Sequence, residues 1–105
     1  MDSKKFRLII SPSATDDLDH IIEYYETKKE GLGERFYRNF MGVLTLLLNN
    51  PFLYAKILFH FRKAIISPFP YSLYYVVDKK QGFVKVVAII HQARSKNFIR
   101  KTLKP

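Results

Sequence analysis

Cysteine is absent from all 105 residues of the chain. Its absence excludes disulfides, thiol nucleophiles and thiolate metal sites, and it fits a reducing compartment. Long hydrophobic runs are also missing. The run over residues 43–48 is interrupted by Thr45 and is far too short to span a bilayer, and the apolar part of "MDSKKFRLII" is too short for a signal peptide. We therefore expect a soluble, cytoplasmic protein with no membrane partner.

Acidic residues are scarce in the C-terminal two thirds of the chain. Residues 35–105 carry thirteen basic side chains and a single acid, Asp78, whereas residues 1–34 have a balance of −3. The formal net charge of +9 is thus concentrated in one part of the sequence. Such a segregated field attracts nucleic acid, an anionic membrane or an acidic protein chain. The alternative interpretation is an ordinary charged surface that keeps the protein in solution.

Signatures of metal and phosphate binding are missing as well. The histidines at positions 20, 60 and 91 are scattered without ligand spacing, so no metal site is predicted. "GLG" at Gly31–Gly33 joins two expected helices instead of following a strand, which excludes a phosphate-binding loop of the usual kind. The acidic cluster over residues 16–23 is explained by a helix start and its solvent-facing side. No cofactor is expected.

The residue pattern predicts a single α+β domain over residues 1–105, with the element order β-α-α-β-β-β. A strand is expected in "KKFRLII". A helix then begins in "SPSATDD", with Ser11 or Ser13 as its cap and with Asp16 and Asp17 in its first turn. Gly31 is expected to cap this helix in the left-handed conformation, and Gly33 to let the chain reverse. The expected buried stripe of the first helix is Leu18, Ile21, Ile22 and Tyr25, and that of the second is Phe36, Phe40, Val43, Leu44, Leu47 and Leu48.

Three strands should follow the helical hairpin, over residues 56–66, 71–78 and 83–90. The second helix ends at "NNP" (49–51), and Gly82 lies at the bend between the last two strands. Short links make these strands an antiparallel meander, and the helices return the chain to the sheet of the first strand. Both helices must lie on the sheet, because neither can bury its apolar stripe alone. The tail after residue 96 could be a short helix or an extended arm.

Alternation along the strands predicts where the polar side chains point. In the strand over 56–66 the face that holds Phe61 and Lys63 is assigned to the core, so Arg62 should project away from it. In the last strand, His91 should share a face with Lys85, Val87 and Ile89, and Arg94 follows just past the end. Basic side chains interleaved with tyrosines suit a phosphate backbone and stacked bases. A half-exposed sheet with ordinary cross-strand pairs fits the pattern equally well.

Four segments together resemble toxins of the RelE/ParE superfamily, which belong to bacterial type II toxin–antitoxin modules and were once described as plasmid stabilisation proteins. The segments are "SPSATDDLDHIIEYY", "GERFYRNFMGVLTLLLNNP", "FRKAIISPFPYSLYYVVD" and "VVAIIHQARS", an apolar strand that ends in His-x-x-Arg. The resemblance implies a helical hairpin packed on a small, mostly antiparallel sheet. It also implies a cognate antitoxin with an acidic, amphipathic C-terminal segment, and a possible toxin–antitoxin hetero-oligomer.

The resemblance leaves two branches of function. RelE-like members cut messenger RNA on the ribosome; on that branch Arg62 and Arg94 would be charge clamps, and His91 or a nearby tyrosine the acid or base. ParE-like members poison DNA gyrase by protein contact and need no catalytic set. No carboxylate lies between Pro51 and Asp78 to act as a base, which favours the ParE branch. A non-toxic, basic nucleic-acid-binding module is a third hypothesis. The residues expected to contact the target are Arg62, Lys63, Tyr71, Tyr74, Arg94 and Lys96.

Overall fold

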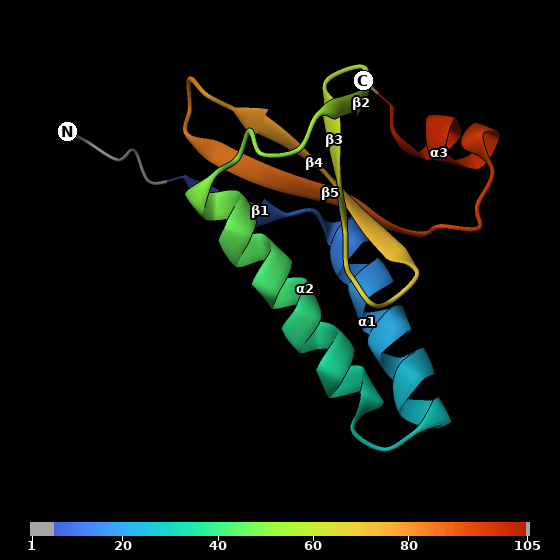
Figure 1. Cartoon of the computed structure of the whole chain (residues 1–105). Coiled ribbons are helices and arrows are strands. Elements are labelled where there is room, and N and C mark those ends of the chain that lie inside the picture. Colours follow the sequence, from blue (N-terminus) through green and yellow to red (C-terminus); the bar gives the residue numbers. More distant parts are fainter. Residues whose placement is uncertain (1–5, 105) are drawn as a thin grey trace.

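The computed structural model describes residues 6–104, and it shows an α+β fold of three helices and a five-stranded sheet (Figure 1). The sheet order is β1-β5-β4-β3-β2, with β1 parallel to β5 and the other neighbours antiparallel. The predicted α+β class and the helical hairpin on a sheet are confirmed. Residues 4 and 5 of the expected first strand lie outside the described part. The elements are β1 (Arg7–Ile10), α1 (Pro12–Lys28), α2 (Leu32–Asn49), β2 (Lys56–Leu58), β3 (Phe61–Ile65), β4 (Tyr71–Asp78), β5 (Phe83–His91) and α3 (Lys96–Thr102).

Helix α1 begins where the sequence predicted a cap. The Ser11 hydroxyl accepts a hydrogen bond of 3.1 Å from the Ala14 N–H, and Pro12 takes the first helical position, where its missing N–H costs nothing. The placement of Asp16 and Asp17 in the first turn was wrong, because the helix starts at Pro12 and its first turn contains no acid. These carboxylates therefore do not compensate the helix dipole.

The turn between α1 and α2 is held by a carboxylate. Gly31 has the predicted left-handed conformation, with a φ of +87°. Its predicted role was wrong, because Lys29 is the C-cap of α1 and Gly31 is the N-cap of α2. The N–H groups of Gly31 and Gly33 donate to the two carboxylate oxygens of Glu26, at 2.9 and 3.0 Å. Gly33 itself does not reverse the chain but lies inside α2, where a Cβ would stand 2.6 Å from the Ile22 carbonyl oxygen. Glycine at this position lets the two helices approach closely.

The segment 56–66 forms two strands, not the single strand predicted. Phe59 adopts a φ of +53°, and the chain turns there, so that β2 pairs antiparallel with β3. The turn carries neither glycine nor proline, the residues that usually mark a break. The element order is therefore β-α-α-β-β-β-β followed by α3, which resolves the tail as a helix.

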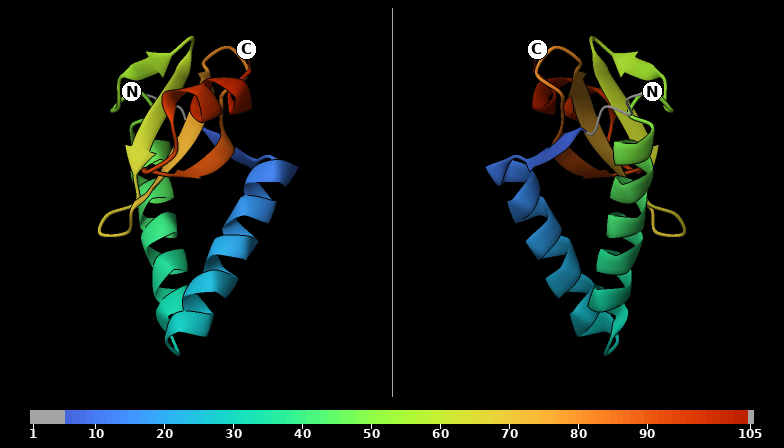
Figure 2. Two further views of the ribbon diagram at one scale, coloured as in Figure 1. Left: turned by 90° about the vertical axis from the view of Figure 1, so that its right-hand side faces the viewer. Right: turned by 90° about the vertical axis from the view of Figure 1, so that its left-hand side faces the viewer.

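The helices cover opposite faces of the sheet (Figure 2). The hairpin of α1 and α2 packs on the face that carries Leu73 and Tyr75 of β4, and this side holds the main core. A smaller cluster on the other face lies beneath α3 and includes Phe61, Tyr74 and Leu103. None of the helices in the described part of the chain is long and apolar enough to cross a membrane.

The assignment of the β3 core face was wrong. Ala64 and Ile66 are fully buried in the main core, whereas Ile65 is 51% exposed. Phe61 is buried, but in the cluster under α3. The break at Phe59 removes the long strand on which the prediction depended.

A β-bulge changes which side chains of β5 share a face. Tyr74 pairs with Ala88 while Tyr75 pairs with Val86, so Val87 is an extra residue on β5. Ile89 consequently joins Val84 and Val86 in the main core, and His91 contacts Tyr71 on that side. The prediction that His91 shares a face with Lys85 and Val87 was wrong because it assumed unbroken alternation.

Candidate functional site

The predicted site residues lie in three separate places. Lys63, Tyr74 and Lys96 line one groove, Tyr71, His91 and Arg94 line a smaller hollow, and Arg62 contacts the loop before β2. We call the first the Tyr74 groove, lined by Ile57, Leu58, Lys63, Tyr74, Lys96, Ile99 and Arg100. We call the second the His91 hollow, lined by Asp17, His20, Ile21, Tyr71, Ile89, Ile90, His91, Arg94 and Phe98.

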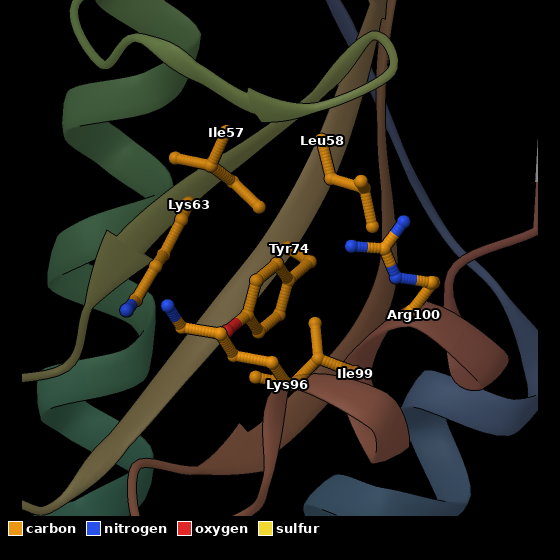
Figure 3. Close-up of a pocket in the computed structure, with 7 residues that line it drawn as sticks. All are labelled: Ile57, Leu58, Lys63, Tyr74, Lys96, Ile99 and Arg100. Atoms are coloured by element: carbon orange, nitrogen blue, oxygen red, sulfur yellow. The ribbon is translucent and has the colours of Figure 1, made fainter.

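The Tyr74 groove has a volume of about 300 Å³ and lies between the β2–β3 hairpin and α3, with Tyr74 as its floor (Figure 3). Tyr74 is only 2% exposed, and its ring packs in the cluster under α3. Burial raises the pKa of the Tyr74 hydroxyl above its ordinary value of 10.0. Within residues 6–104 this hydroxyl makes no hydrogen bond. It is therefore a neutral donor that is open to the groove.

The charge of the groove has one sign. Lys63 of β3, Lys96 of α3 and Arg100 of α3 line it, and no lining residue is acidic. In the described part of the chain the acids other than Asp78 lie between residues 16 and 34, on α1, the following turn and the start of α2. The sequence did not indicate Ile99 and Arg100 as site residues, because it left open whether the tail forms a helix. The alternation of basic and apolar side chains in the tail is the signal that could have indicated them.

The His91 hollow, of about 200 Å³, lies where α1 meets the end of β5 and the start of α3. The His91 Nδ1 accepts a hydrogen bond of 2.9 Å from the Ala93 N–H, and its ring stands edge-on to Tyr71 at 4.9 Å between centroids. The Arg94 guanidinium lies 4.3 Å from the centre of the Phe98 ring. His91 and Arg94 thus hold the turn from β5 to α3.

Asp17 also lines the His91 hollow, although the sequence placed it on the solvent-facing side of α1. Its carboxylate accepts a hydrogen bond of 3.1 Å from the Ile89 N–H. Burial raises the pKa of Asp17, and the hydrogen bond from Ile89 opposes part of that shift. Asp17 joins α1 to β5 beside the bulge, a contact that sequence spacing cannot indicate.

Arg62 does not point away from the main core, as predicted, but into the loop on the hairpin side. Its Nη1 donates to the Tyr54 carbonyl, and the guanidinium lies 5.1 Å from the centre of the Phe52 ring. Within residues 6–104, no group of three or more histidine, cysteine or acidic side chains is placed to hold a metal ion.

Residues 8–96 match the family profile described as the ParE toxin of the type II toxin–antitoxin system parDE. The match covers most of the chain. The chain belongs to the ParE toxin family. Most of α3, including Ile99 and Arg100 of the Tyr74 groove, lies beyond the matched range.

Solved structures share the fold of this ParE-family chain at low sequence identity. The chromosomal ParDE toxin–antitoxin system of P. aeruginosa contains a chain with a TM-score of 0.70 at 17% identity, covering 85% of this chain and 98% of that one. For the archaeal RelE–RelB complex from Pyrococcus horikoshii OT3 the TM-score is 0.61 at 16% identity, with coverages of 87% and 99%. A mutant of E. coli toxin RelE in the free state gives 0.59 at 16% identity, with coverages of 94% and 99%. No curated protein sequence matches the chain.

These findings confirm the RelE/ParE resemblance and place the chain among type II toxins. The structures include both ParE and RelE proteins, so the fold alone does not separate the two branches of function. The separation has to come from the side chains of this chain.

Proposed function

We propose that this toxin inhibits growth by binding DNA gyrase and does not cut RNA. The observation that supports the proposal is that Arg62 does not converge with His91 and Arg94, the other two expected catalytic residues. Arg62 is opposite Tyr75 on β4, and His91 is opposite Tyr71. These two positions are four residue steps apart, about 13 Å along β4. In their observed positions the Arg62 and His91 side chains therefore lie in separate parts of the structure.

The three residues are also engaged in contacts within the protein. Arg62 is bonded to the Tyr54 carbonyl, the His91 Nδ1 accepts from Ala93, and Arg94 lies over Phe98. Each contact fixes a loop or a turn. A toxin that acts by protein contact needs this kind of rigid surface and no acid–base pair.

The test compares two reactions of the purified chain. With gyrase and relaxed plasmid, we expect inhibition of supercoiling to increase with the concentration of the toxin. With purified ribosomes and messenger RNA, we expect intact messenger. In cells, replication should stop and a DNA-damage response should begin while translation continues. Messenger cleavage on ribosomes together with normal supercoiling would refute the proposal.

A second candidate function, ribosome-dependent RNA cleavage, is favoured by the His91 hollow. Tyr71, His91 and Arg94 meet there with the carboxyl of Asp17. If this hollow were catalytic, His91→Ala would lower cleavage about a hundredfold or more, the usual scale for a lost acid or base. His60→Ala is the matched control, because His60 is exposed in the β2–β3 turn.

We infer that an antitoxin with an acidic, amphipathic segment neutralises the toxin. The basic charge of residues 35–105 would steer such a segment, and exposed apolar side chains would anchor it. Co-expression of the neighbouring gene should restore growth, and its product should co-purify with the toxin. Failure of both would count against this partner.

A further inference from the structure

We propose that the Tyr74 groove is the site where the antitoxin's acidic segment is anchored, with one carboxylate side chain held by the Tyr74 hydroxyl and by the ammonium groups of Lys63 and Lys96. The proposal rests on the antitoxin partner of the proposed function. It adds the location of the contact and the chemistry that recognises it.

The Tyr74 hydroxyl is the first observation. The side chain is 98% buried, yet the groove is open above it, and the hydroxyl has no hydrogen-bond partner in the described part of the chain. Its raised pKa keeps it protonated, so it can donate but holds no charge of its own. In the described part of the chain only the Ser72 Oγ is a fully buried side-chain polar atom without a partner, so the Tyr74 hydroxyl is reached through the open groove, where a bound acceptor can take its hydrogen bond.

The two lysines are the second observation. Lys63 comes from β3 and Lys96 from the first residue of α3, and Figure 3 shows both side chains extending along the side of the groove toward which the Tyr74 hydroxyl points. No acidic side chain lines the groove to neutralise them. A carboxylate placed here would accept hydrogen bonds assisted by charge, which are about twice as strong as neutral ones.

The apolar walls indicate a peptide and not a small anion. Ile57, Leu58 and Ile99 form the walls of the groove. A second hollow, of about 530 Å³, continues from it past Ile57 and Lys63 to Ile65, and these two isoleucines are 48% and 51% exposed. A segment that places aliphatic side chains beside the anchoring carboxylate would bury this surface.

Two other occupants fit less well. Single-stranded RNA binds by stacking its bases on exposed aromatic faces, but the Tyr74 ring is buried in the cluster under α3 and offers no face. A second copy in a symmetric dimer would place Lys63 and Lys96 against the same lysines of its partner. Like charges at such a contact oppose association.

The experiment measures binding of two labelled peptides to the whole chain by fluorescence anisotropy. One peptide is rich in leucine and glutamate, and its twin has glutamine in place of every glutamate. We expect the glutamate peptide to bind and the glutamine twin to bind at least tenfold more weakly. Tyr74→Phe should weaken the glutamate peptide about tenfold, the scale of one hydrogen bond to a charged group. Lys63→Ala and Lys96→Ala should each weaken it severalfold.

Lys80→Ala is the control, because Lys80 is exposed in the β4–β5 turn away from the groove; it should bind like the parent. The proposal would be overturned if the two peptides bound equally, or if Lys80→Ala weakened the glutamate peptide as much as the groove variants do. It would also be overturned if oligouridine displaced the peptide and the groove variants weakened oligouridine binding in the same way. Self-association that competes with the peptide would overturn it as well. The supercoiling assay on the parent chain separates this proposal from the proposed function. If the parent does not inhibit gyrase but binds the glutamate peptide with the expected variant pattern, only the gyrase target is refuted.

Discussion

The two faces of the sheet differ in how far helices cover them. Two long amphipathic helices cover one face, and sixteen buried residues in the described part of the chain form its core. The seven-residue α3 covers part of the other face, where the corresponding cluster has five. The first face supplies the stability of the fold, whereas the second leaves apolar and basic side chains open to a partner. Variants on the two faces should therefore affect different properties.

The largest effect is expected on the hairpin face. Phe36 is fully buried and packs against Phe69 and Tyr25, at centroid distances of 5.0 and 5.6 Å. Phe36→Ala should lower the free energy of unfolding by about 3–5 kcal/mol, because it removes the ring and leaves a cavity. Urea unfolding followed by circular dichroism measures this loss. Leu46→Ala, on the same helix but 52% exposed, should change stability by about 0.5 kcal/mol or less; a similar loss in both variants would contradict the comparison.

The next effect concerns the face under α3. Leu103 is 1% exposed and ends α3, with its N–H bonded to the Ile99 carbonyl. Leu103→Ala should lower the free energy of unfolding by about 2 kcal/mol, the low end for a buried leucine, since a terminal segment can settle into the space. Hydrogen exchange should accelerate in α3 and stay unchanged in α2. Acceleration in α2 of the same size would show that the two faces unfold as one unit.

The fold was predictable where the spacing of apolar residues along the sequence is regular. The apolar spacing of α1 and α2 and the turn at Gly82 predicted real elements, because long amphipathic helices and glycine turns are specified locally. The failures occurred at Phe59 and Val87, where the chain turns or bulges without glycine or proline. Tertiary packing decides these positions, and each break reversed the faces of the residues that follow.

A variant at Arg62 tests whether the observed position of this side chain contributes to the stability of the fold. The sequence predicted that Arg62 projects away from the core face toward the surface, but in the structure its guanidinium donates to the Tyr54 carbonyl and lies beside Phe52. Arg62→Ala should lower the free energy of unfolding by about 1.5 kcal/mol, because the carbonyl loses a charged donor. Arg94→Ala, at an exposed position, should cost about 0.5 kcal/mol or less. Overlapping thermal melts of the two variants would restore the original prediction.

The candidate site was predicted only as a set of residue types. Lys63, Tyr74 and Lys96 do meet in one groove, but the sequence grouped them with Arg62, Tyr71 and Arg94, which lie elsewhere. The types of these residues indicated a basic surface that contains tyrosines. Which of the residues share a groove depends on the bulge in β5 and on the packing of α3 against the sheet, and both arise from contacts between residues distant in sequence.

The smallest effect on stability is expected at Tyr74, and it depends on pH. Burial raises the pKa of Tyr74 in the folded chain above 10.0, its value in the unfolded chain. Above about pH 10 the unfolded state loses this proton first, so the folded state binds more protons and stability falls as pH rises. Tyr74→Phe should nearly match the parent at neutral pH, because the hydroxyl has no partner within residues 6–104, and should lose less stability above pH 10. Urea midpoints at the two pH values measure the difference. Parallel losses in both proteins would mean that Tyr25, Tyr71 and Tyr75, whose pKa values burial also raises, account for the alkaline effect without Tyr74.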